Sequence, residues 1–340
     1  MMVYNIPIKY FLGEKMTVVF SILAILAIIL LITCYTFSVT FHSPRNKHNT
    51  LDEPLHGEQY EAVSDHIFRA AHIMEKYPCE EVWITSFDGT RLFGRYYHNR
   101  DGAPLKILFH GYRSCAYRDC SGGHSLSRKL GFNALVVDQR AHGKSDGTTI
   151  CFGVKEHRDC LCWIKYANAR FGTDIPIILS GLSMGAATVL MATGLPLPEN
   201  VVCVIADSPY SAPSAIIEKV CQDNHYPVAI CRPFFHLGAW LFGGFRLNSC
   251  TAKDAVSRST VPILLIHGED DRLVPCTMSH EIADCCASPV AVHTFPESGH
   301  GLCYIIDPLR YERIICAFLM TIPELSNRIS EDFIRSLFEK

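Results

Sequence analysis

The chain has 340 residues, of which 49% are apolar and 19% charged, and its formal net charge is −3. This length can bury a core that needs no disulfide or metal, and a near-neutral charge without a Lys/Arg cluster argues against nucleic acid as a partner. The sixteen cysteines show no zinc-ligand spacing and are expected to be small buried apolar residues, with structural disulfides as the alternative.

An uncharged apolar run follows a short N-terminal tail (residues 1–15). Residues 16–41 carry no charged side chain and can cross the hydrocarbon core of a membrane as one helix. A cleaved signal peptide is less favoured, because the run is too long and lacks a small-x-small cleavage site. We therefore predict a single-pass membrane anchor. The flanking basic residues nearly balance, and a short tail before a signal anchor favours a location of the remaining chain outside the cytoplasm.

A polar linker is expected over residues 42–61 and a single domain over residues 62–340. The domain begins with a short helix near residues 62–76. Two strands, residues 82–86 and 92–97, follow around the turn Asp88-Gly89.

Beyond these strands, short apolar runs alternate with helical patterns. The expected strands are Leu105–Phe109, Ala134–Val137, Ile177–Leu179, Val201–Ile205, Ile263–Ile266 and Val290–Phe295. Strands without polar alternation are buried on both faces, which predicts an α/β fold with a mostly parallel sheet covered by helices on both faces. Asp307-Pro308 is a good start for the last long helix.

One insertion interrupts this alternation. Residues 211–254 form a connection whose length is typical of a functional lid, with an ordinary crossover helix and loop as the alternative. Its aromatic residues Phe234, Phe235, Trp240 and Phe242 occur at mixed spacings and cannot all be buried on one helix face. We therefore expect a helical lid whose aromatic side chains line an apolar acyl pocket.

The most informative motif is Gly181-Leu182-Ser183-Met184-Gly185, which stands between an apolar strand and an Ala-rich helix. A sharp strand-to-helix turn strains the backbone, and the flanking glycines leave room for it. Such a turn presents the serine at the carboxyl end of the sheet, above the helix N-terminus. Ser183 is therefore the predicted nucleophile.

A nucleophilic serine needs a base, and the base needs an orienting carboxylate. The loop after the strand Ile263–Ile266 carries three candidate acids, Glu269, Asp270 and Asp271. The loop after the strand Val290–Phe295 carries His300 between two glycines. Each partner thus follows a later strand in the order serine, acid, histidine that this arrangement requires.

An oxyanion hole takes one N–H from the residue after the nucleophile and one from a loop after an earlier strand. These donors are expected to be the backbone N–H groups of Met184 and Tyr112. His110, two residues before Tyr112, is interpreted as a structural residue that turns this loop.

Together these motifs resemble the α/β-hydrolase family, in particular its membrane-anchored and bacterial branch of serine aminopeptidase-like and monoacylglycerol-lipase-like hydrolases. The resemblance extends over most of the chain from Val82 onward. It is carried by Phe109-His110-Gly111-Tyr112, Asp138-Gln139-Arg140-Ala141-His142-Gly143-Lys144-Ser145, Gly181 to Gly185, His267 to Pro275 and Gly299-His300-Gly301. The family pattern implies that Asp271, rather than Glu269 or Asp270, is the acid. Ala141 stands where the family usually has glycine.

The expected activity is hydrolysis of a small-molecule or lipid-like carboxylic ester by Ser183, His300 and Asp271, with no metal or organic cofactor. An aminopeptidase or amidase is the alternative enzyme, for which Glu218 or Asp223 would bind the ammonium group of the substrate. A non-catalytic hydrolase-like binding protein is the alternative from another class. Residues 1 to about 41 are expected to be dispensable for catalysis and required for membrane association.

Overall fold

The computed structural model describes residues 8–44, 51 and 57–338. Its centre is an eight-stranded sheet in the order β1-β2-β4-β3-β5-β6-β7-β8. The strands are β1 Glu80–Thr85, β2 Arg91–Tyr97, β3 Leu105–Phe109, β4 Asn133–Asp138, β5 Ile177–Leu182, β6 Val201–Asp207, β7 Ile263–Gly268 and β8 Val290–Phe295. Strand β2 pairs antiparallel with both β1 and β4. The remaining pairs are parallel, so β3 to β8 all run in one direction. The predicted mostly parallel sheet is confirmed.

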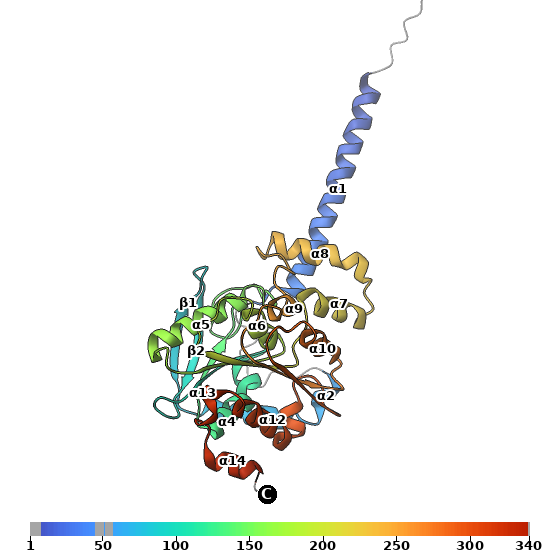
Figure 1. The fold of residues 1–340 in the computed structure, drawn as a ribbon. Coiled ribbons are helices and arrows are strands. Elements are labelled where there is room, and N and C mark those ends of the chain that lie inside the picture. The colour runs from blue at the N-terminus through green and yellow to red at the C-terminus, as the bar shows by residue number, and fades with distance from the viewer. Residues whose placement is uncertain (1–7, 45–50, 52–56, 339–340) are drawn as a thin grey trace, which may run out of the picture.

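Helices cover both faces of this sheet (Figure 1). One face carries α5 Glu156–Phe171, α6 Met184–Ala192, α9 Ala252–Val256 and α10 Thr277–Ala283. The other carries α3 Ser64–Glu75, α4 Ala116–Leu130, α11 Cys303–Ile306, α12 Pro308–Met320, α13 Pro323–Ser326 and α14 Glu331–Phe338. Strand side chains on both faces are buried, as in β4 and β6, where every residue is buried. This burial explains why the sequences of these strands are continuous apolar runs.

Local sequence signals account for several element ends. Asp307 caps α12, because its side chain accepts a hydrogen bond from the Arg310 backbone N–H at 3.0 Å. Gly131 ends α4 in the left-handed region with φ 82°. Ala141 has φ 62°, in the left-handed region that favours glycine, the residue that the family resemblance implies at this position.

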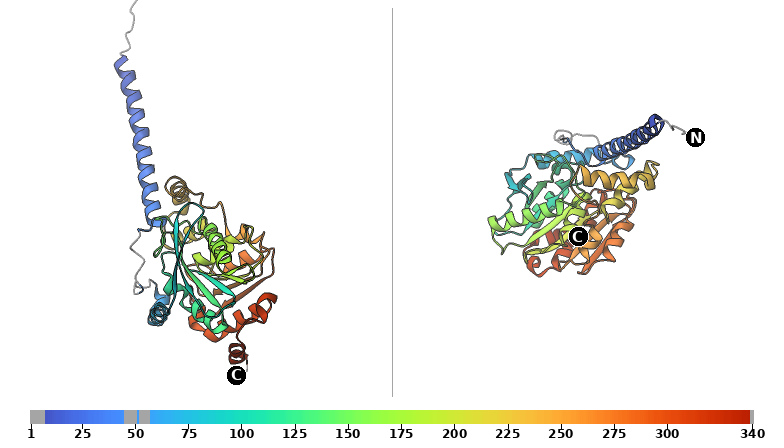
Figure 2. Two further views of the ribbon diagram at one scale, coloured as in Figure 1. Left: turned by 90° about the vertical axis from the view of Figure 1, so that its left-hand side faces the viewer. Right: turned by 90° about the horizontal axis from the view of Figure 1, so that it is seen from above.

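The N-terminal helix α1 (Ile8–Thr40) projects from the domain, and α14 lies at the opposite end of the molecule (Figures 1 and 2). The segment Lys15–Thr40 is long and apolar enough to cross a membrane, with a mean hydropathy of 2.9. Its side chains are exposed through most of its length, for example Phe20 and Leu31.

The predicted insertion consists of α7 Pro213–Asp223 and α8 Val228–Leu241, followed by a loop and α9. The insertion lies on the side of the domain that carries α6 and α9 (Figure 1). Its helix α8 crosses the last turns of α1. At this crossing a β-carbon on Gly238 would lie 3.2 Å from Cβ of Phe37 and 3.4 Å from the Thr33 carbonyl oxygen. Glycine therefore allows the close approach of the two helices.

The C-terminal end of α1 is part of the domain core. Phe41 is fully buried and packs edge-to-face against Phe152 and Phe245, with ring centroids 5.6 and 5.7 Å apart. The backbone beyond it pairs with another loop, since Ser43 N donates to the Thr148 carbonyl at 2.8 Å. All sixteen cysteines lie in the described part of the chain, and each is a free thiol.

Candidate active site

Ser183 lies at a strained turn between β5 and α6. Its φ of 56° and ψ of −116° are unfavourable for a residue with a side chain. Two neighbouring glycines make the turn sterically accessible. A β-carbon on Gly181 would lie 2.2 Å from the Gly185 carbonyl carbon, and one on Gly185 would lie 2.2 Å from the Phe109 carbonyl oxygen. The glycines on both sides of Ser183 are thus required by backbone packing.

Asp271 and His300 form a buried pair after β7 and β8. His300 Nδ1 and Asp271 Oδ2 are 2.6 Å apart, and both residues are about 7% exposed. The other carboxylate oxygen accepts the backbone N–H groups of Leu273 and Val274 at 2.9 and 2.8 Å. These bonds fix the carboxylate so that it faces Nδ1 of the imidazole.

The electrostatics of this pair favour a carboxylate beside a basic imidazole. Burial alone would raise the pKa of Asp271, but hydrogen bonds from His267 and His300 outweigh it and hold that pKa well below its usual range. Burial alone would lower the pKa of His300, but the hydrogen bond with Asp271 and its charge raise it above its ordinary value.

Glu269 and Asp270, the other two candidate acids, are exposed. Glu269 accepts a hydrogen bond from the Thr294 hydroxyl at 2.6 Å. The structure brings Asp271 alone of the three acids to His300.

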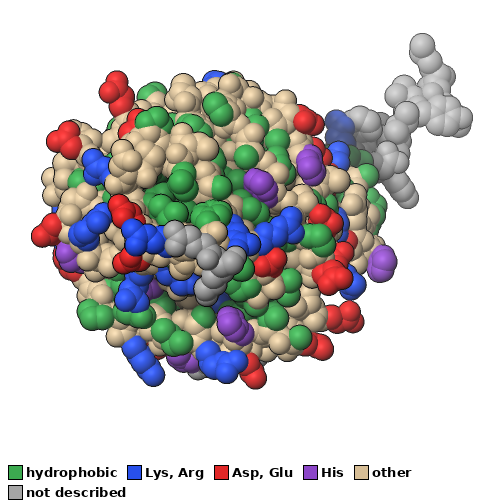
Figure 3. Space-filling model, turned by 60° about the horizontal axis from the view of Figure 1, so that its bottom comes forward, with side chains coloured by type: hydrophobic (Ala, Val, Ile, Leu, Met, Phe, Trp, Pro, Cys, Tyr) green, Lys and Arg blue, Asp and Glu red, His purple; other side chains and the backbone are tan. Residues whose placement is uncertain are grey.

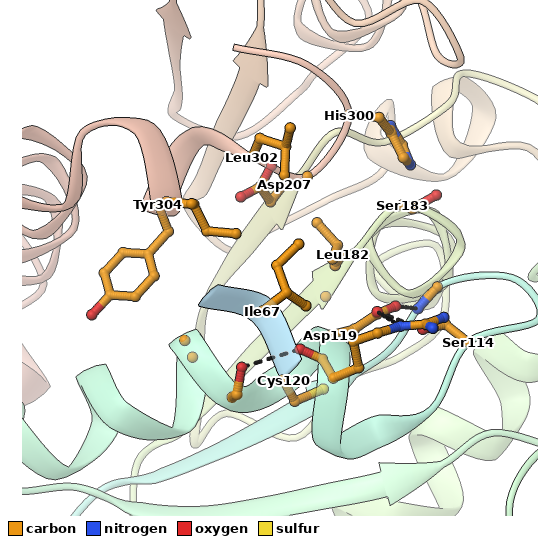
Figure 4. A pocket seen from close by; sticks show the side chains of 18 of the residues that line it. Ile67, Ser114, Asp119, Cys120, Leu182, Ser183, Asp207, His300, Leu302 and Tyr304 are labelled. Atoms are coloured by element: carbon orange, nitrogen blue, oxygen red, sulfur yellow. Dashed lines mark hydrogen bonds and ion pairs between the residues drawn. The ribbon is translucent and has the colours of Figure 1, made fainter. Parts of the chain in front are cut away.

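Ser183 and His300 both line one cavity (Figure 4). The imidazole of His300 points toward the Ser183 hydroxyl in that view. The hydrogen bonds found among the described residues do not include one between them, and in substrate-free enzymes such a contact is commonly long and shortens when substrate binds.

The loop after β3 lies against Ser183. A β-carbon on Gly111 would lie 3.4 Å from Cβ of Ser183, so the backbone that leads into Tyr112 passes directly beside the strained turn at Ser183. Asp119 of α4 accepts the Gly111 N–H at 2.8 Å, and Arg113 N donates to Nε2 of His142 at 2.9 Å. Met184, the other predicted donor, is the first residue of α6.

His110 is completely buried beneath this loop. Its Nε2 accepts the Gln139 N–H at 3.0 Å, and the Gln139 side-chain amide donates to the His110 carbonyl at 2.6 Å. These contacts agree with the structural role that the sequence indicated for His110.

Two residues of the predicted linker hold the backbone of His300. Gln59 Oε1 accepts the His300 N–H at 3.0 Å, and the Tyr60 hydroxyl donates to the His300 carbonyl at 3.1 Å. Gly299 is needed for this approach, because a β-carbon there would lie 2.3 Å from Gln59 Oε1. The short helix α2 (Glu58–Glu61) therefore belongs to the site, a role that the sequence analysis missed.

The cavity has a volume of about 540 Å³ and extends from Ser183 along the sheet face covered by α3 and α4. Figure 4 shows Ile67 of α3 and Cys120 of α4 on one side, with Leu302 and Tyr304 of the histidine loop and α11 on the other. Its apolar walls include Ile67, Leu108, Leu182, Leu302 and Ile305. The polar residues Lys106, Ser180, Asp207 and Tyr311 also line it.

The four aromatic residues predicted to form the pocket do not line this cavity. Phe235 is buried in the apolar cluster around Phe41, and Phe234 is half-buried on α8. Trp240 and Phe242 are 58% and 40% exposed, and the Phe242 ring lies 5.4 Å from that of Phe37 on α1. The pocket prediction was wrong for these side chains because the insertion packs on α1 and the α6 face, whereas the cavity lies on the opposite face beneath α3.

The two carboxylates considered for an aminopeptidase are also outside the cavity. Glu218 is paired with Arg232 at 2.7 Å, and Asp223 with Lys219 at 2.6 Å, both at the surface of the insertion. Within the described ranges, no group of three His, Cys, Asp or Glu side chains could hold a metal ion.

The end of α1 contacts the loop that carries the predicted oxyanion donor. The Tyr112 hydroxyl donates to the Thr40 carbonyl at 2.7 Å, and the Arg113 guanidinium donates to the carbonyls of Val39 and His42 at 2.8 and 3.0 Å. Together with the buried Phe41, these contacts make the last turn of α1 part of the packed domain. The last turn of α1 thus holds the loop of Tyr112 and Arg113. That residues 1 to about 41 are dispensable for catalysis stays a prediction.

Comparison with known proteins agrees with this architecture. The model of the alpha/beta hydrolase family matches residues 107–314, which is more than half of the chain. The protein therefore belongs to the alpha/beta hydrolase family.

Individual relatives and a solved structure are similar to the chain. The uncharacterised protein YqkD of Bacillus subtilis is 25% identical over 74% of this chain and 82% of its own length. The lysophosphatidylserine lipase ABHD12 of Danio rerio is 27% identical over 63% of this chain, which spans only 53% of that lipase. The Pyrococcus furiosus esterase Pf2001 superposes with a TM-score of 0.61 at 21% identity, over 82% of this chain and 99% of the esterase. The chain is thus similar to esterases and lipase-like proteins of the family.

Proposed function

We propose that the protein hydrolyses carboxylic esters through a catalytic triad of Ser183, His300 and Asp271. The proposal is carried by the 2.6 Å contact between His300 Nδ1 and Asp271 Oδ2, which leaves Nε2 of the same imidazole on the side of Ser183. The strained turn at Ser183 supports it, because this conformation exposes a serine hydroxyl above a helix N-terminus.

The chemistry is acyl transfer to water. Ser183 Oγ attacks the ester carbonyl carbon while His300 Nε2 takes the hydroxyl proton, and Asp271 stabilises the resulting imidazolium. The backbone N–H groups of Tyr112 and Met184 donate to the oxyanion of the tetrahedral intermediate. His300 then gives its proton to the departing alcohol, which leaves an acyl ester on Ser183. Water, deprotonated by His300, attacks this ester and releases the carboxylic acid.

The walls of the cavity support an ester with an apolar portion. Ile67, Leu108 and Leu302 are well placed to contact a hydrocarbon chain that extends from Ser183. Burial of each methylene contributes about 0.8 kcal/mol, so chain length should influence kcat/KM.

Ser183→Ala tests this function directly. The variant should lose hydrolysis of para-nitrophenyl esters on the order of 10⁴-fold or more, because the nucleophile and its base act as a unit. Circular dichroism and thermal unfolding serve as controls that the variant is folded. A folded variant with activity close to that of the native enzyme would refute the assignment.

We further propose that α1 anchors the protein in a membrane. From Met16 to Ile32 the helix is about 26 Å long at about 1.5 Å per residue, close to the thickness of the hydrocarbon core. Helix α8 crosses α1 at Thr33, and Ile230 and Trp240 of α8 are exposed. Charged side chains of both signs are spread over the face of the domain turned away from α1 (Figure 3).

This arrangement supports a membrane surface at the level of α8, with the domain outside the cytoplasm as the sequence favours. Full-length protein should stay in the membrane fraction after a carbonate wash, and a protease added outside intact cells should cleave the domain. Release by the wash would count against the anchor, and protection of the domain would reverse the orientation.

A further inference from the structure

One residue that lines the catalytic cavity, Lys106, lies far from Ser183 along the strands. Lys106 pairs in register with Ile178, and Ser183 follows Ile178 by five positions on β5. At a rise of about 3.3 Å per residue, the backbone of Lys106 lies about 17 Å from that of Ser183 along the strands. Lys106 and Leu108 alternate with residues of the other face and share the side of the sheet covered by α4. Both line the cavity.

Lys106 differs from the other buried cations near the site. Its side chain is only 2% exposed, yet no hydrogen bond or ion pair links Nζ to a residue in the described part of the chain. By contrast, Arg95 is paired with Asp138 at 3.0 Å, and Arg140 with Asp159 at 2.6 Å. A buried ammonium without a partner is costly, so a protein that keeps one commonly uses it.

The carboxylates that share the cavity with Lys106 are occupied by other donors. Asp207 accepts hydrogen bonds from the Ser208 and Tyr311 hydroxyls, both at 3.0 Å. Burial raises the pKa of Asp207 above its ordinary value. Asp119 is held by the Gly111 N–H at 2.8 Å and by the Ser114 hydroxyl at 2.5 Å. In the described part of the chain, neither carboxylate is hydrogen-bonded to Nζ of Lys106.

We propose that Lys106 binds a carboxylate of the substrate. This carboxylate stands at the end, remote from the scissile bond, of the substrate portion that enters the cavity. The enzyme then acts on esters in which a hydrocarbon chain separates the scissile bond from an anionic group. This inference rests on the proposed ester hydrolysis and names its substrate class. A carboxylate fits better than a phosphate, because one compact ammonium matches a single negative charge.

The charge state of Lys106 agrees with this role. Burial lowers the pKa of Lys106 to about 8, so the side chain is still mostly protonated at neutral pH. The apolar walls near Ile67 and Leu302 separate it from the Ser183 end of the cavity.

The test compares matched esters on the full-length protein. One series carries the anion on the acyl side, para-nitrophenyl hydrogen suberate against para-nitrophenyl octanoate. A second carries it on the alcohol side, the acetate ester of an omega-hydroxy acid against that of the matching alcohol. The variants are Lys106→Met, which keeps the volume, and Lys106→Gln, which keeps a polar end. Lys165→Met, at an exposed position on α5, is the matched control.

In at least one series the native enzyme should prefer the anionic ester. Both Lys106 variants should lower the ratio of anionic to neutral kcat/KM by about ten- to a hundredfold, the range expected for loss of a hydrogen bond to a charged group. Lys165→Met should leave the ratio unchanged. Equal rates for both esters in both series, or a ratio that survives in the folded Lys106 variants, would overturn the proposal.

A binding measurement separates this proposal from the proposed function. Free suberate should raise the Tm of native protein, octanediol of the same length should not, and the effect of suberate should vanish in Lys106→Met. If the native protein hydrolyses no ester at all, the proposed function fails, and the suberate shift alone decides whether Lys106 binds a carboxylate. Absence of that shift in the native protein would reject the site.

Discussion

Asp271→Asn is the change whose outcome follows most closely from the contacts in the site. Asn keeps the shape of Asp271, and its carbonyl oxygen can still accept the backbone N–H groups of Leu273 and Val274. Its amide nitrogen then faces Nδ1 of His300, which must become an acceptor. The proton moves to Nε2, so the imidazole can no longer take the proton of Ser183.

The magnitude of this effect is large because the wrong tautomer stops the first chemical step. We expect a loss of about 10⁴-fold in kcat, equivalent to about 5.4 kcal/mol of transition-state stabilisation. Hydrolysis of a para-nitrophenyl ester measures it. Asp270→Asn and Glu269→Gln are matched controls at exposed positions of the same loop and should leave kcat close to that of the native enzyme.

The pH profile gives a second readout of the same pair. Activity requires neutral His300, so kcat/KM should fall on the acid side as pH drops through the His300 pKa of the free enzyme. Asp271 holds that pKa above its ordinary value of 6.5. In Asp271→Asn the lowering effect of burial remains and the carboxylate is gone, so the acid limb should move to lower pH. A larger loss in Asp270→Asn, or an acid limb that does not move, would refute the reasoning.

Two further predictions concern the support of the site and the position of the pocket. Phe41→Ala should lower stability by about 3–5 kcal/mol, because it empties a fully buried ring position. Thermal unfolding in detergent should show a reduced Tm, whereas Phe20→Ala, on the exposed part of α1, should not; equal Tm values would contradict the packing of α1. Ile67→Trp should shift ester preference toward shorter chains by filling the cavity, and Trp240→Ala should not. The reverse pattern in a chain-length series would put the pocket under the insertion.

The sheet could be predicted from the sequence because its signals are local. The apolar run of Leu105–Phe109 is one strand with the predicted bounds, and Val290–Phe295 is another. The same holds for the glycines around Ser183, whose backbone contacts lie within one turn of chain or on the neighbouring strand. The position of Asp271 relative to the end of β7 follows from the family pattern.

Other features of the site depend on contacts between distant parts of the chain. Gln59 and Tyr60 reach His300 across more than two hundred residues, and their neighbourhood carries only the polar, proline-containing composition of a linker. The aromatics of the insertion gave a clear apolar signal, but composition does not distinguish a cavity wall from a surface beside α1. Lys106 lies inside an apolar strand pattern, and only the placed neighbours show that no described residue is bonded to its Nζ.

The central claim is that Ser183 is an activated nucleophile. A fluorophosphonate probe reacts with such a serine, and peptide mass spectrometry identifies the residue that carries the adduct. The account predicts one adduct, on Ser183, that is absent from folded Ser183→Ala and greatly slowed in Asp271→Asn. Failure of the native protein to react, or an adduct on another residue that persists in Ser183→Ala, would contradict it.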